Sequence, residues 1–555
     1  MARLDRLSTV RAIAQLGATI GREFSYELLH AVSLLAEETL QQGLKQLVAA
    51  ELVYQRGLVP QATYLFKHAL IQDTAYQSLL KSTRQQYHRQ IAQALTERFP
   101  ETTKTQPELL AHHYTEAGLL EQAIPYWQKA GERATQRSAY VEAINHLTKG
   151  LELLTTLPDH PNLLQQELTL QMALGAPLTA TKGTAAREVG KAYARARELC
   201  QQLGETPQLF QVLRGLWLFY IARAEHQTAR ELAEQCLRLA QSARDPTLLL
   251  EAQYMLGNTL FYFGEFAPAR EHFEQSMALY NFGQHHSHAF LYGQDTGVVC
   301  LARVAWVIWF LGYPDQALKL SYQAMTLARE LSHPHSQAYA LGLAAALHQL
   351  RREGQAAQEQ AEAAMTLSTA QGFPLWVAWG TVLRGWALAK QERGEEGISQ
   401  IRRGMATFRA TGAEVSRPYL PALLAEAHEK AGQVEEGLSS LAEALAAVDN
   451  SGERWYEAEL YRLKGELTLQ SKVESQKSKA EEAEACFLKA IEVARKQQAK
   501  FLELRATTSL ARLWQQQAKR SEAHKLLAEV YDWFTEGFDT KDLQEAKALI
   551  EELSE

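Results

Sequence analysis

The sequence predicts an all-α protein, a solenoid of stacked helical hairpins that follows a small N-terminal module. Two observations predict the solenoid. Met325, Met365 and Met405 are each forty residues apart, and small residues recur at the same step. A fixed period of this length is typical of supersecondary units that stack on their neighbours, rather than of one globular core.

The recurring small residues predict where neighbouring helices approach closely. Two helix backbones can come close only where the side chain between them is Gly, Ala or Ser, so these positions should be packing points. Two earlier copies of the frame start at Ala224 and Gly264. The aligned sets are Ala305, Ala345, Gly385 and Ala425; Gly312, Arg352, Glu392 and Gly432; Ala317, Ala357, Gly397 and Gly437; and Ala324, Ala364, Gly404 and Ala444.

Within one step the pattern resembles the tetratricopeptide (TPR) repeat, which is a helix, a Gly-centred turn and a second helix. The stretches GEFAPAREHFEQSMALY and GYPDQALKLSYQAM carry its signature, G-x4-A-x3 followed by an aromatic or small residue. The step is longer than the ~34 residues of a TPR and overlaps the ~40–47 residues of HEAT and armadillo units. We favour a TPR-like solenoid, with a generic helical array as the alternative.

Residues 1–100 are expected to form a separate module, and residues 101–555 the repeat array. A helix, a break and a helix precede a third helix from residue 36. The stretches LVYQRG and ATYLFKH, separated by Gly57 and Pro60, then indicate a β-hairpin. Three helices followed by a two-stranded wing describe a winged helix, and a long helix from Ala69 links it to the array.

Three segments depart from the regular pattern. Leu174–Ala186 is rich in Gly, Pro and Thr, which predicts a loop between helices. Tyr280–Gly297 adds eight residues to the forty-residue step. Ser471–Lys479 is charged and predicts an exposed loop.

The bulk properties of the chain limit its function. The formal net charge of −7 over 555 residues gives no global basic field that would recruit nucleic acid or acidic membranes. The scattered Cys200, Cys236, Cys300 and Cys486 form no C-x-x-C motif, so neither a zinc site nor a disulfide framework is expected. The sequence has neither a signal-peptide pattern nor an uncharged apolar run of membrane length. We therefore expect a cytoplasmic protein with no membrane partner.

No motif for catalysis is recognisable. A P-loop needs G-x4-G-K-[ST], whereas the Gly190–Lys191 pair is followed by Ala192 and lacks the first Gly. H-E-x-x-H, G-x-S-x-G and G-x-G-x-x-G are also missing from the sequence. We therefore assign no catalytic, cofactor-binding or metal-ligating residue and no cofactor, and we expect a protein that is not an enzyme.

Histidines and tryptophans are the remaining candidates for a site. The histidines at 112–113, 285–288 and 333–335 lack the i, i+4 spacing of helical metal ligands and are interpreted as solvated loop residues. The aromatic residues of the array are interpreted as packing between hairpins in preference to a ligand-stacking surface. They are Trp306, Trp309, Tyr313, Trp376, Trp379 and Trp386.

Long stretches resemble the C-terminal region of bacterial multidomain signalling ATPases, including those fused to class III adenylate/guanylate cyclase domains. GATIGREFSYELL, LVAAELVYQRG and ATYLFKHALIQDTAYQSLL carry the resemblance over residues 4–100. LAHHYTEAGLLEQAIPYWQKAGERA and WFTEGFDTKDLQEAKALIEEL extend it along the chain. In that family a winged helix follows the ATPase domain and precedes a TPR array. The resemblance implies that this chain corresponds to those last two parts. It also implies that Leu4, Leu7, Val10 and Ile13 form an apolar face that is exposed without the ATPase.

Together these features predict a non-catalytic signalling scaffold. A protein or peptide partner would bind the concave surface of the repeat array, and an ATPase or cyclase domain would dock on residues 1–100. One alternative is the regulatory part of an ATP-dependent adenylate cyclase or ATPase that acts with a separate catalytic chain. The other is a winged-helix DNA-binding regulator, which the net charge disfavours.

Overall fold

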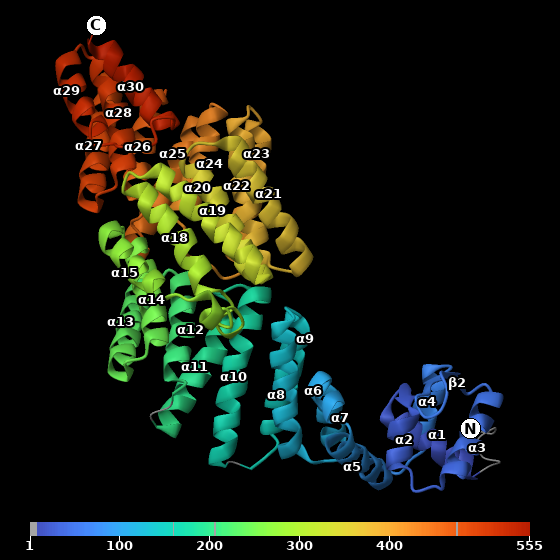
Figure 1. The fold of residues 1–555 in the computed structure, drawn as a ribbon. Helices are drawn as coiled ribbons and strands as arrows, with labels where there is room; N and C mark the ends of the chain where they lie inside the picture. Colours follow the sequence, from blue (N-terminus) through green and yellow to red (C-terminus); the bar gives the residue numbers. More distant parts are fainter. Residues whose placement is uncertain (1–7, 159, 205–206, 473–475, 555) are drawn as a thin grey trace. The chain divides into compact units, whose positions relative to one another are not determined.

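The computed structural model describes residues 8–158, 160–204, 207–472 and 476–554. It divides into two compact units, Met1–Ala173 and Leu174–Glu555. Helices make up almost all of its regular structure (Figure 1). The prediction of an all-α helical-repeat fold is therefore confirmed.

The first unit combines a small sheet with short helices. Its elements are α1 (Ser8–Ile20), β1 (Glu23–Ser25), α2 (Tyr26–Val32), α3 (Glu37–Ala49), β2 (Val53–Arg56), β3 (Thr63–Phe66), α4 (Ala69–Gln77), α5 (Lys81–Arg98), α6 (Pro100–Thr105), α7 (Pro107–Glu116), α8 (Leu120–Gln136), α9 (Tyr140–Leu154) and the start of α10 (Pro161–Lys182).

The three strands form one antiparallel sheet in the order β1-β3-β2. Val53 pairs with Phe66 in the predicted hairpin, and Glu23 pairs with Leu65 on the other side of β3. β1 is missing from the sequence prediction because its three residues are too few to show an alternating pattern.

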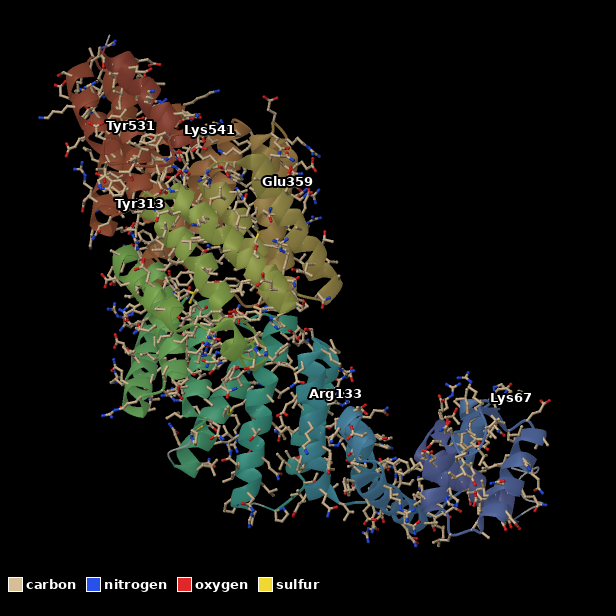
Figure 2. All side chains as sticks on the ribbon, in the orientation of Figure 1. Lys67, Arg133, Tyr313, Glu359, Tyr531 and Lys541 are labelled. Atoms are coloured by element: carbon tan, nitrogen blue, oxygen red, sulfur yellow. The ribbon has the colours of Figure 1, made fainter. Side chains whose placement is uncertain are left out.

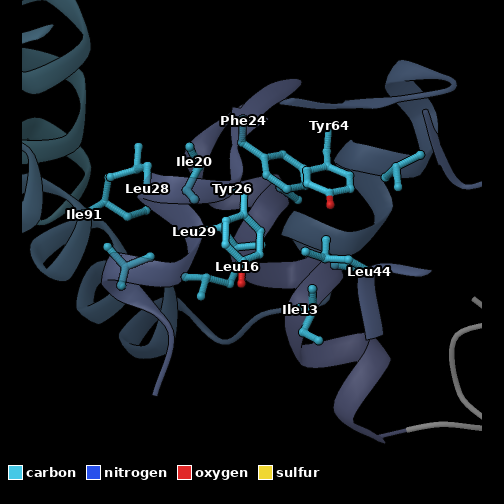
Figure 3. Close-up of a cluster of buried hydrophobic side chains, with 14 of the residues drawn as sticks. Ile13, Leu16, Ile20, Phe24, Tyr26, Leu28, Leu29, Leu44, Tyr64 and Ile91 are labelled. Atoms are coloured by element: carbon cyan, nitrogen blue, oxygen red, sulfur yellow. The ribbon is translucent and has the colours of Figure 1, made fainter. Parts of the chain in front are cut away.

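The core of this module contains the apolar face of α1 (Figure 3). Val10 and Ile13 are buried, so the expectation that they are exposed is wrong. The reason lies on α3, where a Cβ on Gly43 would be 2.3 Å from Ile13 Cδ1, so the missing side chain leaves room for Ile13. Leu4 and Leu7 lie outside the described residues.

The second unit is a stack of helical hairpins that follow one another in chain order (Figure 1). Its helices are α11 (Arg187–Leu203), α12 (Leu209–Ala222), α13 (His226–Ala243), α14 (Pro246–Tyr262), α15 (Phe266–Leu279), α16 (Phe282–His285), α17 (His288–Tyr292), α18 (Thr296–Phe310), α19 (Pro314–Leu331), α20 (Pro334–Leu350), α21 (Gly354–Gln371), α22 (Pro374–Lys390), α23 (Gly394–Ala410), α24 (Tyr419–Lys430), α25 (Val434–Ser451), α26 (Glu457–Gln470), α27 (Gln476–Gln497), α28 (Lys500–Gln516), α29 (Arg520–Tyr531) and α30 (Lys541–Ser554).

Backbone conformation confirms the forty-residue frame. The residue in the turn between the two helices of a hairpin adopts a positive φ, which is the left-handed region that favours glycine. The same turn position holds Gly312, Arg352, Glu392 and Gly432, with φ values of 101°, 63°, 65° and 72°. Two of the four positions thus adopt this conformation without a glycine, so the geometry of the turn is kept more strictly than its residue type.

The small residues are packing points, as predicted. Ala317 and Ala357 are fully buried where α19 and α21 pack on the first helices of their hairpins. Where α22 meets α23, a Cβ on Gly397 would be 2.5 Å from the carbonyl oxygen of Gly385. Larger side chains at these positions would push the two helices apart.

The predicted loop Leu174–Ala186 is largely helical, and the predicted loop Ser471–Lys479 ends in a helix, with residues 473–475 outside the described residues. α10 continues to Lys182 through Pro177, so only residues 183–186 of the expected loop are irregular. Gly175 packs so closely that an added Cβ would be 2.0 Å from the hydroxyl of Tyr193, and this tertiary contact outweighs weak local helix propensity. Similarly, α27 begins at Gln476, and Lys479 is buried rather than exposed.

Candidate ligand-binding cavity

The inner wall of the second unit consists of the first helices of successive hairpins. α12, α14, α18, α20, α22 and α24 contact one another in series, and α18 also contacts α28. The side chains of α14 from Leu250 to Tyr262 are all buried. α14 is therefore enclosed on all sides, although it carries polar residues such as Glu251 and Asn258.

Aromatic side chains from distant hairpins fill much of this inner wall. The Trp455 ring lies 5.2 Å from Phe261, 5.5 Å from Trp306 and 5.1 Å from Tyr419, measured between ring centroids. A backbone hydrogen bond joins the same two segments: the N–H of Arg454 donates to the carbonyl of Tyr262 at 2.8 Å. One turn of the superhelix therefore brings α14 against the segment that precedes α26.

A cavity of about 90 Å³ remains beside this aromatic cluster. Its wall combines tyrosine and tryptophan rings with the buried polar side chains of Thr184, Asn258, Gln294, Arg303 and Ser416, and it also includes the half-buried Leu218 and Leu375. The residues on which the following argument depends are Tyr254, Asn258, Gln294, Arg303, Trp306 and Trp376.

Arg303 is the charged residue of the cavity, and its side chain is only 7% exposed. Its Nη2 donates to the hydroxyl of Tyr262 at 3.2 Å and to that of Tyr339 at 3.4 Å, and its guanidinium lies 5.0 Å from the Trp306 ring. Burial raises the pKa of the Tyr262 hydroxyl to about 12, so this partner is neutral. Within the described residues no carboxylate lies within 4.0 Å of Arg303, and its Nε has no hydrogen-bond partner.

Two amide side chains add unpartnered acceptors to the same cavity. Asn258 is 2% exposed and Gln294 is 4% exposed. The Oδ1 of Asn258 and the Oε1 of Gln294 have no hydrogen-bond partner in the described protein. Nearly all buried polar groups in folded proteins are hydrogen-bonded, so these two amide oxygens, like the Nε of Arg303, are exceptions on side chains that line the cavity.

The tryptophans of the cavity already have partners for their N–H groups. Trp306 donates to the carbonyl of Leu343 at 3.0 Å, and Trp376 donates to His335 Nε2 at 3.2 Å. Their rings therefore offer apolar surface to the cavity, while Asn258, Gln294 and Arg303 offer the polar contacts.

A second buried charge cluster, centred on Glu251 of α14, contains an arginine that is paired with a carboxylate. Glu251 accepts from Arg214 Nε at 2.6 Å and from the hydroxyl of Thr296, and it pairs with His288 Nδ1 at 2.7 Å. Burial alone would raise the pKa of Glu251, but the charge of Arg214 and these hydrogen bonds lower it to about 2. This network ties the inserted segment with α16 and α17 to the hairpin stack.

The predicted packing role of the tryptophans holds for some of them. Trp309 stacks on Phe501 at 4.9 Å, and Trp386 donates to Glu426 at 3.2 Å, so both have structural partners. Trp306, Trp376 and Trp379 instead line the cavity. Some of these tryptophans therefore only pack between helices, whereas others also form part of the cavity wall.

The interpretation as solvated loop residues is wrong for most of these histidines. His113, His285, His288, His333 and His335 are buried, whereas His112 and His286 are exposed. Burial lowers the pKa of His333 to about 3 and that of His335 to about 4, which keeps both rings neutral at pH 7. Among the residues that the structure describes, no group of three or more His, Cys, Asp or Glu side chains is arranged to hold a metal ion.

Sequence reasoning did not assign Asn258, Gln294 or Arg303 to a cavity. Arg303 interrupts an otherwise apolar helix, and this single charge in a buried segment was the available signal. Asn258 and Gln294 carry no motif of their own. The Gly190–Lys191 pair, by contrast, has a structural role, because a Cβ on Gly190 would be 2.6 Å from the ring of Phe219.

Across the described parts of the chain, no helix is both long and apolar enough to span a lipid bilayer.

Comparison with protein families identifies one segment. Residues 208–281 match the tetratricopeptide repeat family, and this segment contains α12 to α15. An uncharacterized protein of Rhizobium meliloti (strain 1021) is 24% identical over 516 residues. The match covers 92% of this chain and 49% of that protein, so the chain spans about half the length of this curated relative.

Several solved helical-repeat structures are similar at low sequence identity. The APC/C hetero-tetramer Cut9–Hcn1 has a TM-score of 0.46 at 11% identity and covers 96% of this chain and 98% of its own. A signal transduction ATPase with a tetratricopeptide repeat sensor, from Pyrococcus horikoshii, has a TM-score of 0.46 at 10% identity. The match covers 83% of this chain and 65% of that one. A Rap protein complexed with Competence and Sporulation Factor has a TM-score of 0.42 at 10% identity. The match covers 63% of this chain and 99% of that one.

Proposed function

We propose that this protein is a non-catalytic regulatory scaffold that binds a peptide segment of a partner at the cavity of its repeat array. The observation that carries the proposal is the buried charge of Arg303, which lines a cavity together with the amide side chains of Asn258 and Gln294 and has only hydroxyl partners in the described chain. The segment that matches the tetratricopeptide repeat family supplies one wall of this cavity, including Leu218 and Asn258. Folds of this kind typically act as protein-interaction scaffolds and bind on their inner surface.

A library of hexapeptides tests this proposal. The full chain is incubated with an equimolar mixture of N-acetylated peptides that end in either a free carboxylate or an amide, and bound peptides are recovered by affinity selection. Leu375→Trp should block the margin of the cavity and weaken binding at least tenfold. Glu359→Trp, on the exposed side of α21 (Figure 2), is the matched control and should leave binding unchanged. Failure of the unmodified chain to retain any peptide contradicts the proposal.

We also propose that residues 1–100 form a winged-helix-like module on which an ATPase or cyclase domain docks, and that residues 101–555 form the repeat array. Exposed apolar side chains support the docking role. Leu58 and Val59, which are adjacent in the segment between β2 and β3, are 82% and 37% exposed. Contiguous exposed apolar surface often marks a contact site for a partner, and these two residues are neighbours.

The second proposal is tested with a binding partner taken from the Rhizobium meliloti relative, namely the part of that protein that lies outside the match. We expect it to bind the full chain in a calorimetric titration, and Leu58→Ser to weaken the complex at least tenfold. Gln61→Ser, on an exposed residue of the same segment, is the control. Equal affinity of the two variants would rule out this surface as the docking site.

A further inference from the structure

We propose that the contact between α5 and α7 in the first unit is an acid-sensitive joint. His88 on α5 and His113 on α7 share one proton in the closed contact, and the contact opens when both rings become protonated. This inference does not depend on the proposed function, because it involves neither the cavity of the second unit nor the docking of a partner.

The two histidines meet through their ring nitrogens. The Nδ1 atoms of His88 and His113 are 2.8 Å apart, which is a hydrogen-bond distance. A hydrogen bond between two imidazole nitrogens needs one nitrogen with a proton and one without, so the pair is complete when both rings are neutral. If both rings were cations, each Nδ1 would carry a proton. Two N–H groups and two positive charges would then face each other at this distance.

The surroundings of the pair disfavour two charges. His88 is 1% exposed and His113 is fully buried, and His113 Nε2 has no hydrogen-bond partner in the described chain. The Nε2 atom of His88 lies 3.0 Å from the hydroxyl of Tyr76 on α4, whose pKa is raised by burial, so this partner is neutral. Burial lowers the pKa of His88 to about 4 and holds that of His113 well below its ordinary value of 6.5. Both rings are therefore neutral at pH 7.

The charged groups around the pair do not compensate for its burial. Besides burial, the charge of a protonated His112 and that of Arg84 lower the pKa of His88. His112 is exposed, and its ring centroid is 5.6 Å from that of His88. Burial also lowers the pKa of His112, on which Glu116 of α7 and Lys149 of α9 act in opposite directions. In the described residues, α1 and α2, which also pack on α5, bring no charged group that shifts the pKa of either buried ring.

Acid therefore favours the open contact. In the open contact both rings reach water and titrate near 6.5, whereas in the closed contact His88 takes up its proton only near pH 4. The closed contact has its full stability above pH 6.5 and loses it as the pH falls towards 4, because the open form binds more protons. Within this window each histidine raises the equilibrium constant for opening by about tenfold per pH unit.

The joint lies between two packed parts of the first unit. α5 packs on α1 and α2, whereas α7 packs on α8. Opening the contact between α5 and α7 would therefore loosen the N-terminal helices from the first hairpin of the array.

Hydrogen exchange of the full chain between pH 7 and pH 5 tests the joint. Each rate is divided by the intrinsic chemical rate at that pH, so that it reports the opening equilibrium. α7 has ten residues, and a helix of this length is marginal without its packing, so loss of the contact should expose its amides. The amides of α27 and α28, whose sequences contain no histidine, are the internal reference.

Three variants assign the effect to the two rings. His88→Gln replaces one titrating ring with a neutral amide, and the double variant His88→Gln/His113→Gln replaces both. His30→Gln, at an exposed position on α2, is the matched control.

We expect the opening of α5 and α7 to increase at least about a hundredfold from pH 7 to pH 5, and that of α27 and α28 to change by less than about threefold. His88→Gln should keep an increase of about twentyfold, which is the share of His113, and the double variant should keep less than about threefold. His30→Gln should match the unmodified chain.

The unmodified chain alone can overturn the proposal, so the test does not depend on the folding of any variant. A corrected exchange rate in α5 and α7 that stays flat between pH 7 and pH 5 overturns it, and so does an equal increase in α27 and α28. An increase that persists in the double variant, or one that His30→Gln abolishes, assigns the pH dependence to other groups and overturns it as well.

Discussion

Two buried arginines on the inner wall of the repeat array differ in their counter-ions. Arg214 on α12 donates to Glu251, and its guanidinium lies 4.0 Å from the ring of Tyr292. Arg303 on α18 has a comparable aromatic surrounding but only neutral hydroxyl partners within the described chain. A paired buried charge holds the fold together, whereas an unpaired one that lines a cavity remains free to bind a ligand.

The largest expected effect comes from breaking the paired site. Glu251→Gln leaves the Arg214 charge buried without an anion, and removing one partner of a buried ion pair typically costs about 3–5 kcal/mol. Hydrogen exchange of the amides in α12 and α14 measures this loss as a local free energy of opening. A loss below about 1 kcal/mol would mean that Arg214 and Glu251 are not a structural pair.

Low pH should destabilise the paired site, because its stability depends on the ionised carboxylate of Glu251. The pKa of folded Glu251 is about 2, below its ordinary value of 4.5. Its contribution to stability is therefore complete above pH 4.5 and is lost as the pH falls towards 2, by about 3 kcal/mol at 1.36 kcal/mol per pKa unit. We expect exchange in α12 and α14 to accelerate across this window. In Glu251→Gln that acceleration should be smaller by this amount, and identical pH profiles would contradict the assignment.

The repeat frame that carries both arginines can be tested by overpacking. Ala357→Leu places a larger side chain where α21 packs on α20, and overpacking typically costs about 1–3 kcal/mol. Glu359→Leu, two residues along the same helix at an exposed position, should change stability by less than about 0.5 kcal/mol. Denaturant unfolding monitored by circular dichroism compares the two variants. Equal losses would show that the frame is assigned in the wrong register.

The smallest effect is expected at the unpaired site. Arg303→Met removes a buried charge and leaves no carboxylate unpaired. The chain loses hydrogen bonds to Tyr262 and Tyr339, each with a net value of about 1 kcal/mol, and the contact of the guanidinium with the Trp306 ring. Removing the desolvated charge offsets part of this loss, so unfolding in denaturant should shift by about 1 kcal/mol or less. A loss as large as that of Glu251→Gln would make Arg303 a structural residue and end the contrast with Arg214.

The repeat frame was predictable from sequence because it is a local property. Small residues at fixed spacing are sufficient to locate the packing points, and the structure buries Ala317 and Ala357 as expected. The cavity was not predictable in this way. Gln294 belongs to the inserted segment, and it lines the same cavity as Asn258 on α14 and Arg303 on α18 only after these two hairpins have stacked. The neutral pairing of Arg303 depends on Tyr262 and Tyr339, which are 36 or more positions away in the sequence.

The aromatic contact between Phe261 and Trp455 also affects how the chain folds during synthesis. The two residues are joined by ring packing and by a neighbouring backbone hydrogen bond, yet more than four hairpins separate them in the sequence. At ~5–20 residues per second, a ribosome takes about 10–40 s to pass from one to the other. During that interval the hairpins around α14 leave the exit tunnel with an aromatic surface that has no partner. Chaperones that bind apolar segments should therefore engage the nascent chain there until Trp455 follows.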